Sequence, residues 1–335
     1  MHDALIVALV SVACVGGADS LSAPPHIIVD LDLPPAARWN GALEEVLAAH
    51  PFEHGFGKTF IAYNASIFDK LTAEDWATLA TAMRTHWAEQ ADELAFIASR
   101  FAANGHPVSF EYLCGWVYMH ELEHSDLAAP SSRHPRACTG IVAQRGGGGA
   151  PTHVANMDQS PPSVRNVTLR VTFQRSGVVV AEAVDWYWFT TGLTRMVQRG
   201  VASLQENWRF SDPPLAHDDV LRAIASGATP HVFYARQALL RPALALPGAA
   251  NAAAVAATYD TTLAYLTSLN IAAPFYIVIA GPAAGQGAIV TRGAGTKLAN
   301  VTTLASQIPT GTGGAGYLVQ TNYEPWLPDR RVGEC

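Results

Sequence analysis

The spacing of apolar residues changes at Cys138, and this change limits the folds open to the chain. Before it, apolar side chains recur every three or four positions, as in Trp76, Leu79 and Met83, which is the period of a helix. After it come short β-type runs such as Val167–Gln174 and Val178–Phe189, joined by a Ser-Gly hairpin signal. Helices followed by strands predict an α+β fold with a layered sheet core.

Further elements follow from the same patterns. Helical periodicity covers residues 36–125, and a Pro-, Ser-, Ala- and Arg-rich stretch at 126–137 predicts an exposed loop. Residues 145–149 read Arg-Gly-Gly-Gly-Gly and predict a flexible turn, because no Gly-Lys-Ser/Thr follows as in a phosphate-binding loop. We expect helices at about 217–241 and 250–268, and strands at 139–144, 153–157, 275–280, 288–291 and 317–321.

Composition narrows the possible partners. The 335 residues are 49% hydrophobic and 15% charged, which is enough for one large domain or two modest ones with a real core. A net charge of −7 argues against nucleic acid, because binding phosphates requires a basic face.

The first residues are typical of a secretory signal. Residues 4–15 form an apolar run followed by Gly16, Gly17 and Ala18, although no basic residue precedes it. The run is shorter than the roughly 20 residues that span a bilayer. Three glycosylation sequons, at Asn64, Asn166 and Asn300, also favour a secreted or lysosomal glycoprotein. We therefore assign residues 1–20 to a signal, and the change of pattern at Cys138 divides the rest into a helical segment (21–137) and a second segment (138–335).

Cys138 stands at a predicted strand start, directly behind the predicted loop. If the peptide bond before it is cut, the new α-amine and the thiol share one residue. An α-amine has an ordinary pKa of about 7.7–8.0, so it can accept the thiol proton and later donate it to a leaving amine. The residue types alone favour an ordinary buried strand cysteine. Once the signal with Cys14 is removed, three cysteines remain, and an odd number is a poor disulfide framework.

Three patches together resemble the acid ceramidase and N-acylethanolamine acid amidase family of N-terminal nucleophile hydrolases. They are residues 137–144, residues 153–158, and residues 318–326 with the Asp-Arg-Arg that follows at 329–331. The resemblance implies an αββα sandwich behind a helical N-terminal segment. It also implies self-cleavage between Ala137 and Cys138, with the two pieces remaining associated. The family hydrolyses long-chain N-acyl lipids, ceramide or N-acylethanolamine, through a thioester on the cysteine, with no cofactor and no metal.

The same resemblance assigns roles to individual residues. Asp158 would orient the α-amine of Cys138 and raise its pKa, which favours the ammonium form. Asn322 would donate to the oxyanion. Glu206 stands where the family has an active-site glutamate, although a solvated helix-end Glu is an alternative. Arg330 corresponds to a family arginine near the site. Residues 186–189, Trp-Tyr-Trp-Phe, are candidates for an acyl channel or for plain core.

Two departures from the family pattern keep a second hypothesis open. The family has an arginine two residues after the motif histidine, His153, and this chain has Ala155 there, which cannot replace a bidentate donor. The chain also ends at Cys335, where family members continue into further strands. A catalytically impaired homologue that binds fatty amides is therefore an alternative, with lipid or peripheral membrane contact in either case.

His120-Glu121-Leu122-Glu123-His124 matches the zinc-protease pattern His-Glu-x-x-His. On a helix the two histidines would share a face, with Glu121 as general base. The longer metzincin pattern fails, because Leu127 and Pro130 replace its glycine and third histidine. A polar, solvated helix terminus is the plainer alternative.

Overall fold

The computed structural model describes residues 23–128, 138–146, 148–157, 161–185, 195–211, 213–240, 257–307 and 316–323. Several predicted features lie outside these residues: the signal segment, most of the loop before Cys138, Asp158, the aromatic run at 186–189, and Arg330.

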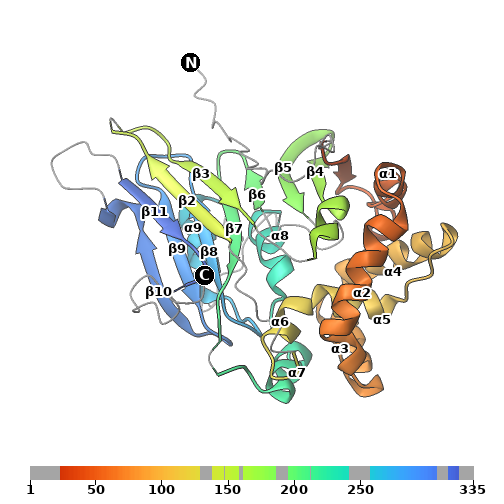
Figure 1. Ribbon diagram of the computed structural model, residues 1–335. Helices are drawn as coiled ribbons and strands as arrows, with labels where there is room; N and C mark the ends of the chain where they lie inside the picture. Colours follow the sequence, from red (N-terminus) through yellow and green to blue (C-terminus); the bar gives the residue numbers. More distant parts are fainter. Residues whose placement is uncertain are drawn as a thin grey trace.

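A group of helices precedes Cys138, as the periodicity predicts, and lies to one side of the sheets (Figure 1). Thr72 begins one of them with a capping box, in which its side chain accepts from the N–H of Asp75 while the Asp75 carboxylate accepts from the N–H of Thr72. The helices are α1 (Ala42–Ala49), α2 (Phe56–Ser66), α3 (Ala73–His86), α4 (Ala88–Ala103), α5 (Phe110–Val117) and α6 (Met119–Glu123), with 3-10 turns at Pro35–Ala37, Phe52–His54 and Phe68–Lys70.

The strands form two sheets within the described part of the chain. The larger has eight strands, antiparallel apart from the parallel pair β1–β4: β1 (His26–Asp30), β4 (Leu169–Arg175), β5 (Val178–Asp185), β6 (Arg195–Gln198), β7 (Ala202–Trp208), β8 (Phe275–Ala280), β9 (Gly287–Arg292) and β10 (Leu298–Thr303). The smaller is antiparallel in the order β11 (Gly316–Gln320), β2 (Thr139–Gln144), β3 (Thr152–Asn156).

The remaining helices lie between the strands in sequence. They are α7 (His217–Ala225), α8 (Tyr234–Leu239) and α9 (Tyr259–Ser268), with 3-10 turns η5 (Pro162–Val167), η6 (His231–Phe233) and η7 (Leu304–Gln307). No helix in the described ranges is long and apolar enough to cross a bilayer.

Strand β8 shows how the layers are stacked. Its alternate residues Tyr276, Val278 and Ala280 pack with Val142 and Leu318 of the small sheet. The intervening residues, Phe275, Ile277 and Ile279, belong to the larger core shared with the helices. The two sheets therefore face one another, and helices cover the other face of the large sheet (Figure 1). On the outer face of the small sheet, Tyr317 is 68% exposed and Val319 is 42% exposed. The α+β prediction is confirmed.

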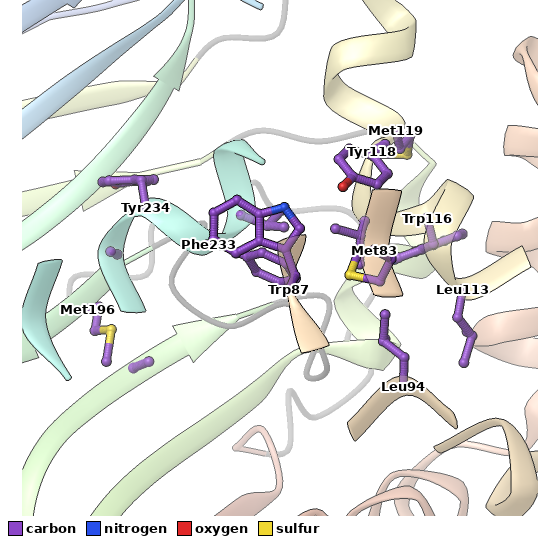
Figure 2. Packing of buried hydrophobic residues seen from close by; sticks show 14 of the residues in the cluster. Met83, Trp87, Leu94, Leu113, Trp116, Tyr118, Met119, Met196, Phe233 and Tyr234 are labelled. Atoms are coloured by element: carbon purple, nitrogen blue, oxygen red, sulfur yellow. The ribbon is translucent and has the colours of Figure 1, made fainter. Parts of the chain in front are cut away.

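The large core joins the helices before Cys138 to elements after it. Figure 2 shows Trp87, which caps α4, against Phe233 of η6, and their ring centroids are 5.6 Å apart. Met83 and Leu94 lie on the helical side of this contact, and Met196 of β6 lies on the other. Burial of this apolar surface is worth about 25 cal/mol per Å², so the two halves of the chain stabilise each other.

A buried ion pair makes the same connection. Both carboxylate oxygens of Glu93 on α4 accept from Arg236 on α8, at 2.5 and 2.6 Å. Arg38 also donates to Glu93, at 3.1 Å, and the indole N–H of Trp39 donates to the same carboxylate at 3.0 Å. Burial by itself raises the pKa of Glu93, but the charges of Arg236 and Arg38 and the hydrogen bonds from Arg236 and Trp39 outweigh it, and the pKa lies below its ordinary value of 4.5.

Replacing Glu93 by Gln should lower the free energy of unfolding by about 3–5 kcal/mol, because the buried guanidinium of Arg236 loses the carboxylate that it binds through both terminal nitrogens and keeps, among the described residues, only the half-exposed Glu89. Since the folded-state pKa of Glu93 is lowered, its contribution is full above the ordinary carboxyl pKa and disappears as the pH falls through the folded value. Denaturant titration at neutral and acidic pH measures both effects. Glu182→Gln, which breaks an exposed pair with Arg199, is the control and should cost under about 1 kcal/mol. Equal effects of the two substitutions would contradict the prediction.

Candidate active site at the start of strand β2

Cys138 is buried immediately before β2, and its backbone N–H donates to Oδ1 of Asn322 at 2.7 Å. Strands β2 and β11 are antiparallel, with Gln320 opposite Gly140, so the start of one and the end of the other meet at the same end of the small sheet. Residues 184 positions apart in sequence are thereby brought into contact. The structure brings together two of the predicted site residues, Cys138 and Asn322.

Two polar side chains of β7 hold this end of the small sheet. Gln205 donates from Nε2 to the carbonyl of Thr139 at 3.1 Å and to Oδ1 of Asn207 at 2.7 Å. Asn207 in turn donates from Nδ2 to the carbonyl of Gln320 at 2.8 Å. One side chain thus fixes the residue after Cys138, and the other fixes the last residue of β11.

Asn322 is fixed by the same strand. Its Nδ2 donates to the carbonyl of Trp208, the last residue of β7, at 2.8 Å. The amide therefore spans from β7 to the backbone nitrogen of Cys138. Because Asn322 is buried and bonded at both ends, it has little freedom to move away from that nitrogen.

Gly140 allows β2 to lie this close to the large sheet. A Cβ at Gly140 would be 2.8 Å from Cγ2 of Val278 and 2.9 Å from Oε1 of Gln205. Both distances are shorter than van der Waals contact. The need for glycine at this position is therefore steric.

A buried histidine and arginine lie between the sheets farther along β3. His153 bonds Ser203 through Nδ1 at 2.9 Å and Gln205 through Nε2 at 3.3 Å. Burial, together with the charge of Arg195, lowers the pKa of His153 to about 3, so the ring is neutral in mild acid. Arg195 of β6 donates to the carbonyl of His153 at 2.9 Å, and burial lowers its pKa to about 10.

Arg195 was not anticipated from the sequence. Ala155 of β3, where the family pattern has an arginine, pairs with Gly140 of β2. The structure nevertheless places a guanidinium against β3, brought there by β6. A strand of four residues carries no periodicity that could have revealed this placement.

The structure places Glu206 away from Cys138. Glu206 pairs with Ile277, whose side chain lies in the helix-facing core, so the alternation of β7 directs Glu206 to the face opposite Gln205 and Asn207. Its carboxylate lies 3.5 Å from Nε2 of His120 on α6. The helix-end alternative for Glu206 is wrong, because the residue is inside a strand.

The described geometry does not assemble a zinc-protease site. His124 follows α6, where its ring stacks on Trp208 at 4.0 Å and bonds Ser211 at 3.0 Å. Glu121, the expected general base, accepts from the backbone N–H of His231 at 2.7 Å. Burial raises the pKa of Glu121, although the His120 charge and that hydrogen bond act against it. The pattern is a buried helix terminus rather than an open metal centre.

Comparison with known proteins finds similarity to an amidase. No family model matches the chain. Among curated proteins, the chain is 26% identical to the N-acylethanolamine-hydrolyzing acid amidase of Caenorhabditis elegans over 338 residues, which is 98% of this chain and 82% of the nematode protein. Among solved structures, the Caenorhabditis elegans ortholog of N-acylethanolamine-hydrolyzing acid amidase matches 56% of this chain and 71% of the solved chain, with 24% identity and a TM-score of 0.44.

Gly140→Ala should destabilise the protein by about 1–3 kcal/mol, because the added methyl group overpacks the contact between β2 and β7–β8. Chemical denaturation measures this loss. Gly149→Ala is the matched control, because a Cβ there meets nothing within 4 Å. If the two substitutions prove equally harmless, the small sheet does not sit as close to the large one as the structure has it.

Proposed function

We infer that this chain belongs to the acid ceramidase and N-acylethanolamine acid amidase family, and we propose that it hydrolyses long-chain N-acyl lipid amides after cutting itself before Cys138. The observation that supports this most directly is the 2.7 Å hydrogen bond from the backbone nitrogen of Cys138 to Asn322. The proposed mechanism needs that nitrogen to be held in place, both as an amide before the cut and as an amine after it.

The reacting groups in self-cleavage are the Cys138 thiol, the Ala137 carbonyl and water. The sulfur adds to the Ala137 carbonyl, the thiol proton passes to the nitrogen of Cys138, the bond from the carbonyl carbon to that nitrogen breaks, and a thioester forms. Water then hydrolyses the thioester, which releases the Ala137 carboxylate and leaves Cys138 with a thiol and an α-amine. Asn322 steadies the nitrogen that becomes the leaving group.

Turnover repeats this chemistry on the substrate. The α-amine takes the thiol proton, the sulfur attacks the acyl carbon, and the tetrahedral oxyanion collapses as the proton passes to the leaving amine. Oδ1 of Asn322 accepts from the ammonium, and its Nδ2 carries a second hydrogen, besides the one on Trp208, for the oxyanion. Water then hydrolyses the thioester to the fatty acid. Asp158 and Arg330 are proposed to orient the ammonium and to bind near the acyl carbonyl.

The leaving amine is ethanolamine or sphingosine, and the relative's name favours N-acylethanolamines as the first substrates to test. We place the protein in a secreted or lysosomal compartment, reached through the signal. The two pieces stay associated, because the Glu93–Arg236 pair and the core around Trp87 and Phe233 lie on both sides of the cut.

Incubation of the purified chain in mild acid should convert one mass into two, with the break between Ala137 and Cys138. Intact mass spectrometry measures this directly. Cys138→Ala should remain whole under the same conditions. If Cys138→Ala is cut equally well, an outside protease is responsible and self-cleavage is wrong. A wild-type chain that stays whole yet binds fatty amides would indicate the catalytically impaired homologue.

Asn322→Ala should reduce kcat on a fatty acyl ethanolamide by roughly 10²–10³-fold, the usual loss when one oxyanion donor is removed. Release of fatty acid per cleaved chain is the measurement. Asn40→Ala changes an exposed asparagine in the helical segment and should leave kcat unaltered. A rise in KM with kcat unchanged would assign Asn322 to substrate binding and contradict the oxyanion role.

A further inference from the structure

Four ionisable side chains meet in the core behind β7, on the face away from Cys138. His120 and Glu121 come from α6, His231 from η6 and Glu206 from β7. Each is at most 3% exposed. Buried polar clusters of this kind are costly unless their charges are matched, so the cluster requires an explanation that the proposed amidase chemistry does not supply.

The distances within the cluster fit a small metal ion. Nδ1 of His231 lies 3.2 Å from Oε2 of Glu121, and Nε2 of His120 lies 3.5 Å from Oε1 of Glu206. One donor atom from each of His120, Glu121 and His231 lies within 4.8 Å of the others. Tetrahedral zinc with bonds of about 2.0–2.1 Å has donor–donor separations of about 3.3–3.4 Å. The two measured pairs are close to that length.

We propose that His120, Glu121, His231 and Glu206 form a closed site for Zn²⁺. Two neutral imidazoles and two carboxylates around a divalent cation have no net charge, which suits a site this deeply buried. The two nitrogen donors favour zinc over calcium or magnesium, which take oxygen ligands. His120 and His231 stack at 3.9 Å with their planes 24° apart, so both rings turn on metal binding until their lone pairs converge.

The surroundings suit a structural ion rather than a catalytic one. The three mutually close donors are His120, Glu121 and His231, and Glu206, 3.5 Å from His120, would be the fourth ligand. Protein atoms would then take all four positions, whereas a catalytic zinc keeps one open for water. Trp208 and Phe275 lie 4.5 and 6.1 Å from the His120 ring and help to exclude solvent. The backbone N–H of His231 holds Glu121 in place at 2.7 Å, as outer hydrogen bonds do around metal ligands.

This site differs from the zinc-protease site that the His120–His124 motif predicts. It uses His231 in place of His124, and Glu121 is a ligand instead of a base. Its ligands also come from both sides of residue 138, two from before it and two from after. Metal binding does not depend on the proposed self-cleavage, but after a cut the ion would tie the two pieces together.

The test uses the full chain loaded with Zn²⁺, dialysed, and measured by elemental analysis. The wild type should retain about one Zn²⁺ per chain, and Co²⁺ in its place should give the visible absorption of a tetrahedral ion. Its Tm should rise when Zn²⁺ is added to chelator-treated protein. Glu206→Gln and His231→Asn should lose the metal. His124→Phe, which preserves the stacking on Trp208, should keep it.

A wild type that retains no zinc and shows no change in Tm overturns the proposal, and this holds even where the variants fail to fold. Loss of metal in His124→Phe together with retention in His231→Asn also overturns it, in favour of the protease geometry. Cys138→Ala should bind zinc like the wild type. A wild-type chain that retains zinc but never cuts itself would contradict the proposed self-cleavage and leave the metal site standing.

Discussion

Strand β7 has polar side chains buried on both of its faces, and every one of them must find a partner within the protein. Gln205 and Asn207 find theirs on the backbone of the small sheet, at Thr139 and Gln320. Glu206 finds His120 on the helical side. A buried polar group without a partner costs about 1–3 kcal/mol, so these pairings fix where the small sheet and α6 can sit. The position of Cys138 follows from that constraint.

The same constraint explains the order of the layers. Apolar contacts alone would let the small sheet slide over β7 and β8, because interchangeable methyl groups specify register weakly. Hydrogen bonds from Gln205 and Asn207 to particular carbonyls do not permit sliding. Gly140 then allows the close approach that those bonds require. Polar contacts thus supply the register, and apolar burial supplies most of the free energy.

Much of the fold could be predicted from sequence because its signals are local. The capping box at Thr72 and the apolar run Phe275–Ala280 both appear at their expected positions. Strand β7 was missed, since a strand buried on both faces with Ser203, Gln205, Glu206 and Asn207 shows no alternation of apolar and polar residues. The contact between Cys138 and Asn322 was reached only through resemblance, because pairing across 184 positions leaves no local trace. Arg195 and His231 reach their neighbours through tertiary packing, which no spacing rule encodes.

The parallel pairing of β1 with β4 bears on how the molecule can be made. Residues His26–Asp30 are the edge strand of a sheet whose other strands all come from beyond Cys138. The N-terminal segment therefore donates a strand, in addition to packing its helices alongside. Synthesis of the C-terminal segment by itself would leave β4 as an open edge, the kind of surface that recruits strands from other molecules. The C-terminal segment therefore depends on the N-terminal one to cover this edge of its sheet.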